Sequence, residues 1–320
     1  MQGWEILPGL VLLMLGGEAI VRGAVNAARR LGVSELLIGL TLVGFGTSTP
    51  ELITSLNAAF QESPGISIGN VVGSNISNIL LIFALVCVVR PVQVNRSALA
   101  RDGFVLLAST LLLIVVALWL GALSRWVGVA FLLGLAAYLT VAWRQESASP
   151  QPAKADAEAT PENRPMPLWA ALGLALLGLA LLIFGADLLV RGARSLAAMA
   201  GLSETVIGLT IVALGTSLPE LVASLAAALR GRSEVVLGTV VGSNIYNVLG
   251  ILGITAAVHP IAIPADMVLR DWVFLYAATL LLLLHTGGAR VSRAEGAFML
   301  AHFGLYVWLL LDPAALSPRV

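Results

Sequence analysis

The chain has 320 residues, of which 58% are apolar and only 11% are charged. Soluble globular domains carry about 25% charged residues, so this composition excludes an ordinary soluble domain and a disordered chain. The 18 basic and 18 acidic side chains cancel, which argues against a nucleic-acid partner. One cysteine and three histidines form no metal-ligand motif. The sequence therefore predicts an all-α polytopic membrane protein that lies in the lipid bilayer.

Ten segments are apolar and long enough to cross the bilayer core, which requires about 20 residues of helix. The first has no positive charge ahead of it, so we expect a retained helix rather than a cleaved signal peptide. The predicted transmembrane segments are about 7–30, 35–60, 66–89, 100–121, 126–143, 167–199, 204–229, 235–257, 270–286 and 294–311.

A polar stretch divides these segments into two sets of five. Residues 144–166 are rich in Pro, Ala, Ser and Glu and lack apolar periodicity, which is typical of a linker. We therefore expect a first five-helix repeat at 1–143, a linker at 144–166 and a second five-helix repeat at 167–320.

The two sets are related by an internal duplication. An offset of 169 residues takes VRGA from 21–24 to 190–193 and VVGSNI from 71–76 to 240–245. Because each copy has an odd number of helices, the second copy must enter the membrane from the opposite side. Such inverted repeats are the architecture of many secondary transporters.

The distribution of basic residues predicts the orientation. With the N-terminus outside, twelve basic residues fall in inner segments and five in outer ones. The positive-inside rule then places both termini outside and the linker in the cytoplasm, in the cytoplasmic (inner) membrane. The inner set is Arg29, Arg30, Arg90, Arg96, Arg101, Arg144, Lys154, Arg164, Arg230, Arg232, Arg290 and Arg293, and the outer set is Arg125, Arg191, Arg194, Arg270 and Arg319.

Two motifs interrupt the second and seventh segments. They read GFGTSTPE at 44–51 and ALGTSLPE at 213–220. Proline removes a backbone donor and glycine loosens the same turn, so each helix should break there. Exposed carbonyls at membrane depth are tolerated only where something polar fills the gap. Carbonyl and carboxylate oxygens together favour a site for a hard cation.

The spacing of the polar residues supports such a site. Side chains four residues apart share one face of a helix. Inverted symmetry should bring the two interrupted helices and the helices that follow them together near the midplane, with Glu51 facing Glu220. The pairs with this spacing are Thr47 with Glu51, Thr216 with Glu220, Ser74 with Asn78, and Ser243 with Asn247; Ser48 and Ser55 flank the first motif, and Ser217 and Ser224 the second.

The charge of this site predicts exchange rather than leakage. Two close carboxylates at the membrane centre repel each other, so the empty site should not rearrange across the membrane. One divalent cation, two or more monovalent cations, or two protons would neutralise it. Oxygen ligands without His or Cys favour Ca²⁺, Na⁺ or Mg²⁺, and the flexible mixture of carbonyls and hydroxyls favours Ca²⁺ over Mg²⁺.

The sequences GTSTPEL at 46–52 and GTSLPEL at 215–221, each followed by GSNI, resemble the α-repeats of the sodium/calcium exchanger family, in the calcium:cation antiporter superfamily. The resemblance covers essentially the whole chain. It implies ten helices, a core of the second, third, seventh and eighth helices, and a first and sixth helix that slide over this core. The linker is too short for a calcium-sensing domain, so the resemblance is to a prokaryotic type without cytosolic regulation.

The resemblance also implies roles for individual residues. Glu51 and Glu220 would chelate Ca²⁺, and Thr47 and Thr216 would add backbone carbonyls. The implied Na⁺ ligands are Ser48, Ser74, Ser217 and Ser243 with the carbonyls of Gly44 and Ala213, while Asn78 and Asn247 would line the middle. No cofactor other than the transported ions and no obligate protein partner are implied.

One position departs from the family pattern. Well-studied members commonly carry Asp where this chain has Asn247, and an acidic residue there is associated with potassium-dependent exchange. Its absence argues against potassium co-transport. It also leaves open the stoichiometry and the choice between Na⁺ and H⁺.

Two pairs of opposite charge occur on the first and sixth segments. Glu18 with Arg22 and Asp187 with Arg191 are four residues apart and are interpreted first as structural ion pairs near the membrane surface. Their place on the helices implied to slide keeps a gating role open.

The sequence thus predicts a Ca²⁺/Na⁺ antiporter rather than an enzyme. The alternatives are a Ca²⁺/H⁺ antiporter that uses the same site and, more remotely, a cation channel. An intramembrane hydrolase would need an aspartate dyad, a serine–histidine or serine–lysine pair, or a zinc-binding helix motif, and no segment at membrane depth contains one.

Overall fold

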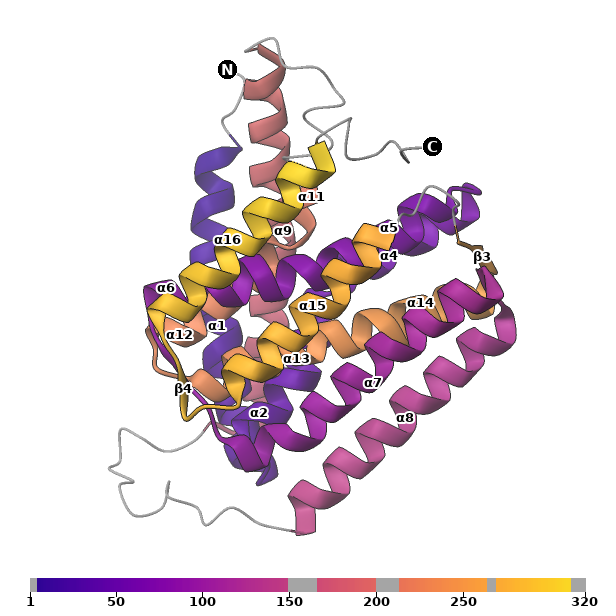
Figure 1. Ribbon diagram of the computed structural model, residues 1–320. Helices are drawn as coiled ribbons and strands as arrows, with labels where there is room; N and C mark the ends of the chain where they lie inside the picture. Colours follow the sequence, from indigo (N-terminus) through magenta and orange to yellow (C-terminus); the bar gives the residue numbers. More distant parts are fainter. Residues whose placement is uncertain (1–4, 149–165, 200–212, 264–268, 312–320) are drawn as a thin grey trace. The chain divides into compact units, whose positions relative to one another are not determined.

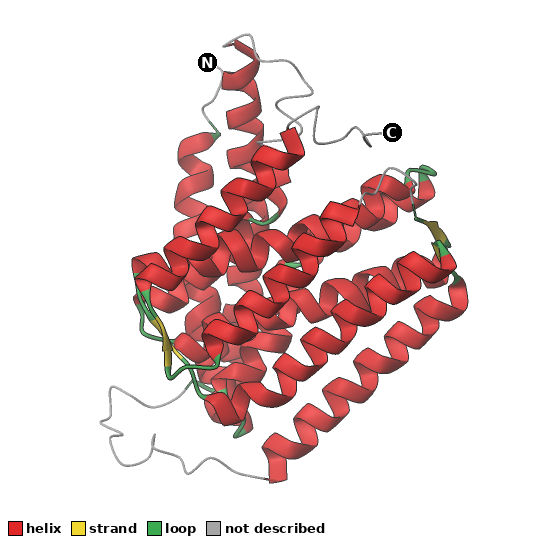
Figure 2. Cartoon of the chain, viewed as in Figure 1, coloured by secondary structure: helices red, strands yellow, loops and turns green. Residues whose placement is uncertain are grey.

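The computed structural model describes residues 5–148, 166–199, 213–263 and 269–311, and these residues are almost entirely helical (Figures 1 and 2). All ten predicted segments are largely helical where they are described. Residues 149–165 of the predicted linker and residues 204–212 of the seventh segment lie outside the described part.

Most of the described segments are α-helices, and a few of them continue into short π-helical segments, labelled η. In the first half they are α1 (Ile6–Leu31), α2 (Glu35–Ile38), η1 (Gly39–Val43), α3 (Gly44–Thr47), α4 (Thr49–Phe60), α5 (Pro64–Ser77), η2 (Asn78–Phe83), α6 (Ala84–Val89), α7 (Arg96–Leu120) and α8 (Arg125–Ala148). In the second half they are α9 (Leu168–Met199), α11 (Ala213–Thr216), α12 (Leu218–Leu229), α13 (Ser233–Ile245), η5 (Tyr246–Ile251), α14 (Leu252–Val258), α15 (Leu269–Thr286) and α16 (Arg293–Leu311).

The ends of the helices differ slightly from the prediction. Helix α8 continues to Ala148, into the predicted linker, because hydropathy marks only its apolar part and the residues that follow include good helix formers. Within the described residues, six helices are long and apolar enough to span a membrane, or seven if the segments at 35–47 and 49–60 form one span. The count of ten spans therefore stays a prediction.

The chain forms two compact units that do not follow the two halves of the sequence. Unit 1 contains residues 1–50 and 140–242, and unit 2 contains residues 51–139 and 243–320. The boundaries fall between Pro50 and Glu51, inside the first proline motif, between Leu139 and Thr140, and between Gly242 and Ser243. Each unit thus combines segments from both halves.

In unit 1, α1 packs closely against α9 through glycines (Figure 1). A Cβ atom added to Gly178 would lie 2.9 Å from the carbonyl oxygen of Gly16, and one added to Gly185 would lie 2.9 Å from that of Gly9. The offset of 169 residues converts each of these two contacts into the other. Such reciprocal antiparallel packing is expected where an inverted repeat meets its own copy, and only glycine permits backbones this close.

Unit 2 contains a similar contact between equivalent residues of the two halves. The hydroxyls of Thr110 on α7 and Thr279 on α15 lie 3.4 Å apart, and their positions differ by 169. Near the start of α7, Asp102 is fully buried, paired with Arg101 at 2.6 Å and bonded by the Tyr138 hydroxyl at 2.9 Å. These partners offset the cost of burying the Asp102 charge.

Two small antiparallel sheets connect the helices of unit 2. Strand β1 (Val92–Gln93) pairs with β4 (Arg290–Val291), and β2 (Ala122–Leu123) pairs with β3 (Ile261–Ala262). Helix α7 lies between β1 and β2 in the chain, and its 25 residues span about 37 Å. The two sheets therefore mark opposite ends of unit 2, a membrane thickness apart.

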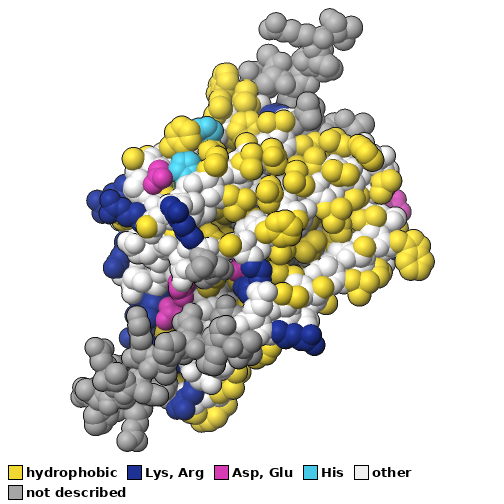
Figure 3. Space-filling view, turned by 60° about the horizontal axis from the view of Figure 1, so that its bottom comes forward, with side chains coloured by type: hydrophobic (Ala, Val, Ile, Leu, Met, Phe, Trp, Pro, Cys, Tyr) yellow, Lys and Arg dark blue, Asp and Glu magenta, His cyan; other side chains and the backbone are white. Residues whose placement is uncertain are grey.

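Large apolar side chains are widely exposed. Phe104, Trp119 and Trp126 are 72%, 85% and 82% exposed, and hydrophobic side chains cover much of the face in Figure 3. A soluble surface does not carry such extensive apolar area, whereas lipid solvates it. The chain is a multi-pass helical membrane protein.

The glycine contacts predict a position-specific loss of stability. We expect Gly178→Ala to lower the free energy of unfolding by about 1–3 kcal/mol, because its Cβ would collide with the backbone of α1. Thermal unfolding of the purified protein measures this. Gly173→Ala on the same helix is the control, since no described atom lies within 4 Å of its Cβ position, and it should be neutral or stabilising by up to about 1 kcal/mol. Equal losses in both variants would contradict the packing argument.

Candidate functional site

Both proline motifs interrupt their helices as predicted. Ser48 separates α3 from α4 with φ −81° and ψ 10°, and Ser217 separates α11 from α12 with φ −91° and ψ 5°. Pro50 and Pro219 are the second residues of α4 and α12, where a missing N–H is tolerated. The sequence therefore determines where each helix restarts.

The glycine of each GTS motif has a packing role in unit 1. A Cβ atom on Gly46 would lie 2.9 Å from Leu179 Cδ2, and one on Gly215 would collide with Val190. Leu179 and Val190 both belong to α9. Small residues at these two positions let both interrupted helices pack closely against α9.

Glu220 is the buried carboxylate of unit 1. It is 2% exposed, and its Oε1 accepts a hydrogen bond of 3.0 Å from the Ser48 hydroxyl. Thr47 lies beside the same carboxylate, but its hydroxyl also donates to the Val43 carbonyl at 3.0 Å. Among the described residues, Glu220 Oε2 has no hydrogen-bond partner. A buried carboxylate with one unpaired oxygen is costly unless a proton or a cation binds it.

Glu51 is the corresponding carboxylate of unit 2 and is 1% exposed. Its backbone carbonyl accepts a hydrogen bond of 3.1 Å from the side-chain amide of Asn70, which also donates to Ser55 Oγ at 2.9 Å. The start of α4 is thereby fixed to α5. Asn70 was not among the predicted site residues, although its spacing from Ser74 and Asn78 places all three on one helical face.

Three asparagines form a buried chain of hydrogen bonds in unit 2. The amide of Asn75 donates to the backbone carbonyl of Asn244 at 3.2 Å, and the amide of Asn247 donates to Asn75 Oδ1 at 2.9 Å. Asn78 begins η2, and Asn247 is the second residue of η5. The Oδ1 atoms of Asn78 and Asn247 are buried and have no hydrogen-bond partner among the described residues. The sequence did not predict these π-helical turns, which often occur at functional sites.

The remaining predicted residues are placed as follows. Ser74, Ser217 and Ser243 are buried, Gly44 is buried at the start of α3, and Thr216 is half-buried. Only the backbone of Ala213 is described, as the first residue of α11. The structure thus brings Ser48 and Thr47 to Glu220 in unit 1. A meeting of Glu51 with Glu220 would join the two units and stays a prediction.

The predicted ion pairs on α1 and α9 are confirmed as contacts. Glu18 pairs with Arg22, and Asp187 pairs with Arg191. Glu18 also pairs with Arg230, the residue that caps the C-terminus of α12. This second partner of Glu18 lies 212 positions away in the sequence, so no local pattern could have revealed it.

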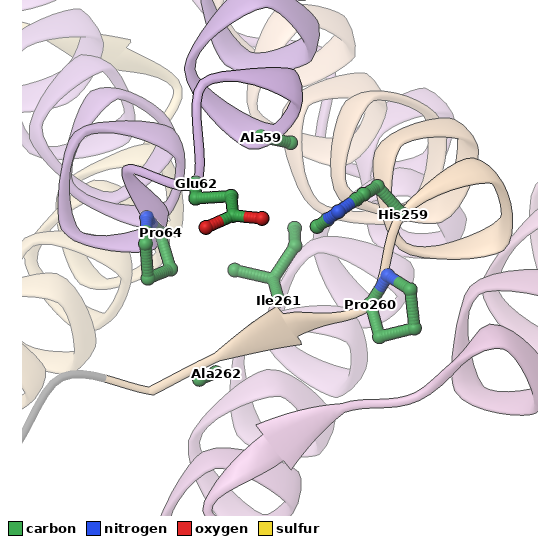
Figure 4. Close-up of a pocket in the computed structure, with 7 residues that line it drawn as sticks. All are labelled: Ala59, Glu62, Pro64, His259, Pro260, Ile261 and Ala262. Atoms are coloured by element: carbon green, nitrogen blue, oxygen red, sulfur yellow. The ribbon is translucent and has the colours of Figure 1, made fainter.

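A pocket of about 200 Å³ lies at the β2–β3 end of unit 2 (Figure 4). The side chains of Glu62 and His259 point toward each other across it, and the rest of the lining is largely apolar. Glu62 follows the end of α4, about 16 Å along the helix direction from Glu51. Within the described residues, no group of three His, Cys, Asp or Glu side chains could hold a metal ion.

Buried polar oxygens on interrupted helices, inside a multi-pass chain, are typical of membrane transporters for cations. The comparison with known families agrees with this class. The family described as sodium/calcium exchanger protein matches residues 4–144 and 170–311. The chain belongs to this family and is a cation antiporter, not an enzyme.

Similar proteins are known along the full length of the chain. It is 40% identical to the putative antiporter CaxA of Alkalimonas amylolytica, over 96% of this chain and 98% of that one. It is 33% identical to the inner membrane protein YrbG of Escherichia coli K12, over 96% and 95%. A solved structure of the sodium-calcium exchanger NCX_Mj, soaked with Na⁺ and Ca²⁺, has a TM-score of 0.81 and 34% identity over 97% of each chain.

Proposed function

We propose that the protein exchanges Ca²⁺ for Na⁺ across the cytoplasmic membrane by alternating access. The observation that carries this proposal is the buried carboxylate of Glu220, which has one oxygen bonded by Ser48 and one without a described partner. Glu51, its equivalent in the other repeat, is also buried. The names of the similar antiporter and exchanger support the same reaction.

In this proposal, both glutamates bind Ca²⁺ near the midplane, and the backbone carbonyls of Thr47 and Thr216 complete its shell. Carboxylates and carbonyls are the ligands that Ca²⁺ prefers. Two negative charges in lipid oppose movement of the empty site, whereas the neutralised site can change sides. Exchange is therefore obligatory.

Na⁺ ions would bind beside this centre, at Ser48, Ser74, Ser217 and Ser243 with the carbonyls of Gly44 and Ala213, while Asn78 and Asn247 supply neutral oxygens between them. A hydroxyl donates one hydrogen bond and still has lone pairs for a cation. Ser48 can therefore bind Na⁺ and donate to Glu220 at once, which links Na⁺ binding to the orientation of a Ca²⁺ ligand.

The orientation follows the positive-inside rule, with both termini outside and the linker in the cytoplasm. In unit 2, the end marked by β1 and β4 carries Arg90, Arg96, Arg101, Arg290 and Arg293, whereas the end marked by β2 and β3 carries Arg125 and Arg270. This asymmetry supports a cytoplasmic position for the β1–β4 end.

The coupling ion can be tested in sealed vesicles that contain the purified protein. We expect an imposed Na⁺ gradient to drive Ca²⁺ uptake, because several Na⁺ ions neutralise the site as Ca²⁺ does. Uptake driven by a pH gradient alone would replace this proposal with Ca²⁺/H⁺ exchange. Currents far above carrier turnover, without any counter-ion, would indicate a channel.

The two glutamates should be individually essential. Glu51→Gln and Glu220→Gln each remove one of the two charges that Ca²⁺ neutralises, so we expect either to reduce Ca²⁺ exchange at least about 100-fold. Initial rates of ⁴⁵Ca²⁺ uptake measure this. Glu62→Gln is the control, because Glu62 is exposed in the pocket of Figure 4, and it should transport normally. Retained transport by Glu220→Gln would remove the basis of the proposal.

We further propose that Glu18, Arg22 and Arg230 gate access at one side of the membrane. Through its ion pair with Arg230, Glu18 links α1 to the C-terminal end of α12, the helix that carries Glu220. The offset of 169 residues relates Glu18 to Asp187 and Arg22 to Arg191, but it relates Arg230 to Gln61. A neutral glutamine cannot form an ion pair equivalent to that between Glu18 and Arg230. The cluster therefore favours closure on the cytoplasmic side, where the positive-inside rule places Arg230, with no charged counterpart from the other repeat.

This asymmetry predicts that two variants shift the apparent KM in the same directions, by weakening closure at the inner side or by adding closure at the outer side. Glu18→Gln should lower the apparent KM for Ca²⁺ at the cytoplasmic side and raise it at the outer side, each by about twofold to fivefold, as expected for a partly exposed ion pair. Gln61→Arg, which supplies the missing charge and so favours closure at the outer side, should shift both values in the same directions. Uptake into vesicles of known orientation gives both values. Parallel shifts at the two sides would contradict gating by this cluster.

A further inference from the structure

The donors and acceptors in the buried asparagine chain of unit 2 follow from the chemistry of the groups that it contains. A backbone carbonyl only accepts hydrogen bonds, so the atom of Asn75 that faces Asn244 must be its Nδ2. The Oδ1 of Asn75 is then the acceptor that faces Asn247, and Asn247 must donate to it with its own Nδ2. The one backbone carbonyl therefore sets the orientation of both side-chain amides.

The orientation of Asn247 decides which of its atoms remains available. Its Nδ2 is bonded to Asn75 at 2.9 Å, while its Oδ1 is fully buried without a hydrogen-bond partner among the described residues. An amide turned the other way would present N–H groups in place of this oxygen. Because N–H groups carry partial positive charge, that orientation would repel a cation.

We propose that Asn75 is a positioning residue, which acts through Asn247 to present Oδ1 rather than Nδ2 to the transported cation. This inference rests on the proposed function, in which Asn247 supplies a neutral oxygen to the site. Partners that orient a metal ligand commonly change metal affinity 10- to 100-fold when they are removed. In a site with an amide instead of a carboxylate at position 247, Asn75 thus keeps an oxygen rather than N–H groups available to the cation.

The proposal predicts that the effect of Asn75 depends on the residue at position 247. We expect Asn75→Ala to raise the apparent Kd for Ca²⁺ about tenfold in the otherwise unchanged chain. In the Asn247→Asp background the same substitution should change it less than about twofold, because both carboxylate oxygens are acceptors and neither needs to be oriented. The readout is the Ca²⁺-dependent rise in Tm of the full-length purified protein, which does not depend on the coupling ion.

A second variant separates orientation from packing. Asn75→Leu fills the space of the side chain but has no acceptor, so it should bind Ca²⁺ as weakly as Asn75→Ala. Thr279→Val is a control for the general loss of a buried hydroxyl in unit 2, and it should keep the wild-type Kd. Restored affinity in Asn75→Leu would mean that a cavity caused the defect, and it would overturn the proposal.

The outcomes distinguish this inference from the function on which it rests. If the unchanged protein shows no Ca²⁺-dependent rise in Tm and no Ca²⁺ exchange, the proposed function fails and the inference fails with it. If the unchanged protein binds Ca²⁺ but Asn75→Ala has the same effect in both backgrounds, or none in either, the function stands and the positioning role is wrong.

Discussion

The structure depends on a carboxylate that is buried in an apolar chain without full compensation. Glu220 accepts a hydrogen bond from the Ser48 hydroxyl, and its Oε2 has no hydrogen-bond partner among the described residues. It lies in the first turn of α12, which begins at Leu218 after the interruption at Ser217. By contrast, the buried Asp102 has both an arginine and a tyrosine hydroxyl as partners. The first arrangement leaves binding capacity for a cation, whereas the second is satisfied and structural. This difference is the reason that Glu220 is proposed as a site residue, whereas Asp102 is assigned a structural role.

Duplication explains much of the packing but not all of it. The glycine contacts between α1 and α9 are reciprocal, and Thr110 meets its own equivalent, Thr279. Departures from this symmetry occur where the two copies have diverged, as at Arg230 and Gln61 or Tyr246 and Ser77. A transporter built from two equivalent halves would treat both sides of the membrane alike, so such departures are where a preferred direction can arise.

Local chemistry made some features predictable. Proline in each motif determined the interruptions, because a missing N–H and a steric clash act within one helical turn. Hydropathy located the helices to within a few residues, and spacing of four identified Glu18 with Arg22. Neither hydropathy nor spacing identified Arg230 as a partner of Glu18, Asn70 as a partner of Glu51, or Asn75 as a partner of Asn247. Each of these contacts joins separate segments of the chain. The π-helical turns at Asn78 and Asn247 also left no local signal.

The sequence by itself determined the class of protein: an apolar, duplicated chain with a proline-glutamate motif in each half, in which buried acids imply cation transport. Only the tertiary structure decided which partners each polar group has. Ser48 meets Glu220, and the direction of the Asn244, Asn75 and Asn247 chain follows from one backbone carbonyl. The physical reason is that helix breaks and hydropathy are local properties of the chain, whereas hydrogen-bond partners are chosen by packing between distant segments.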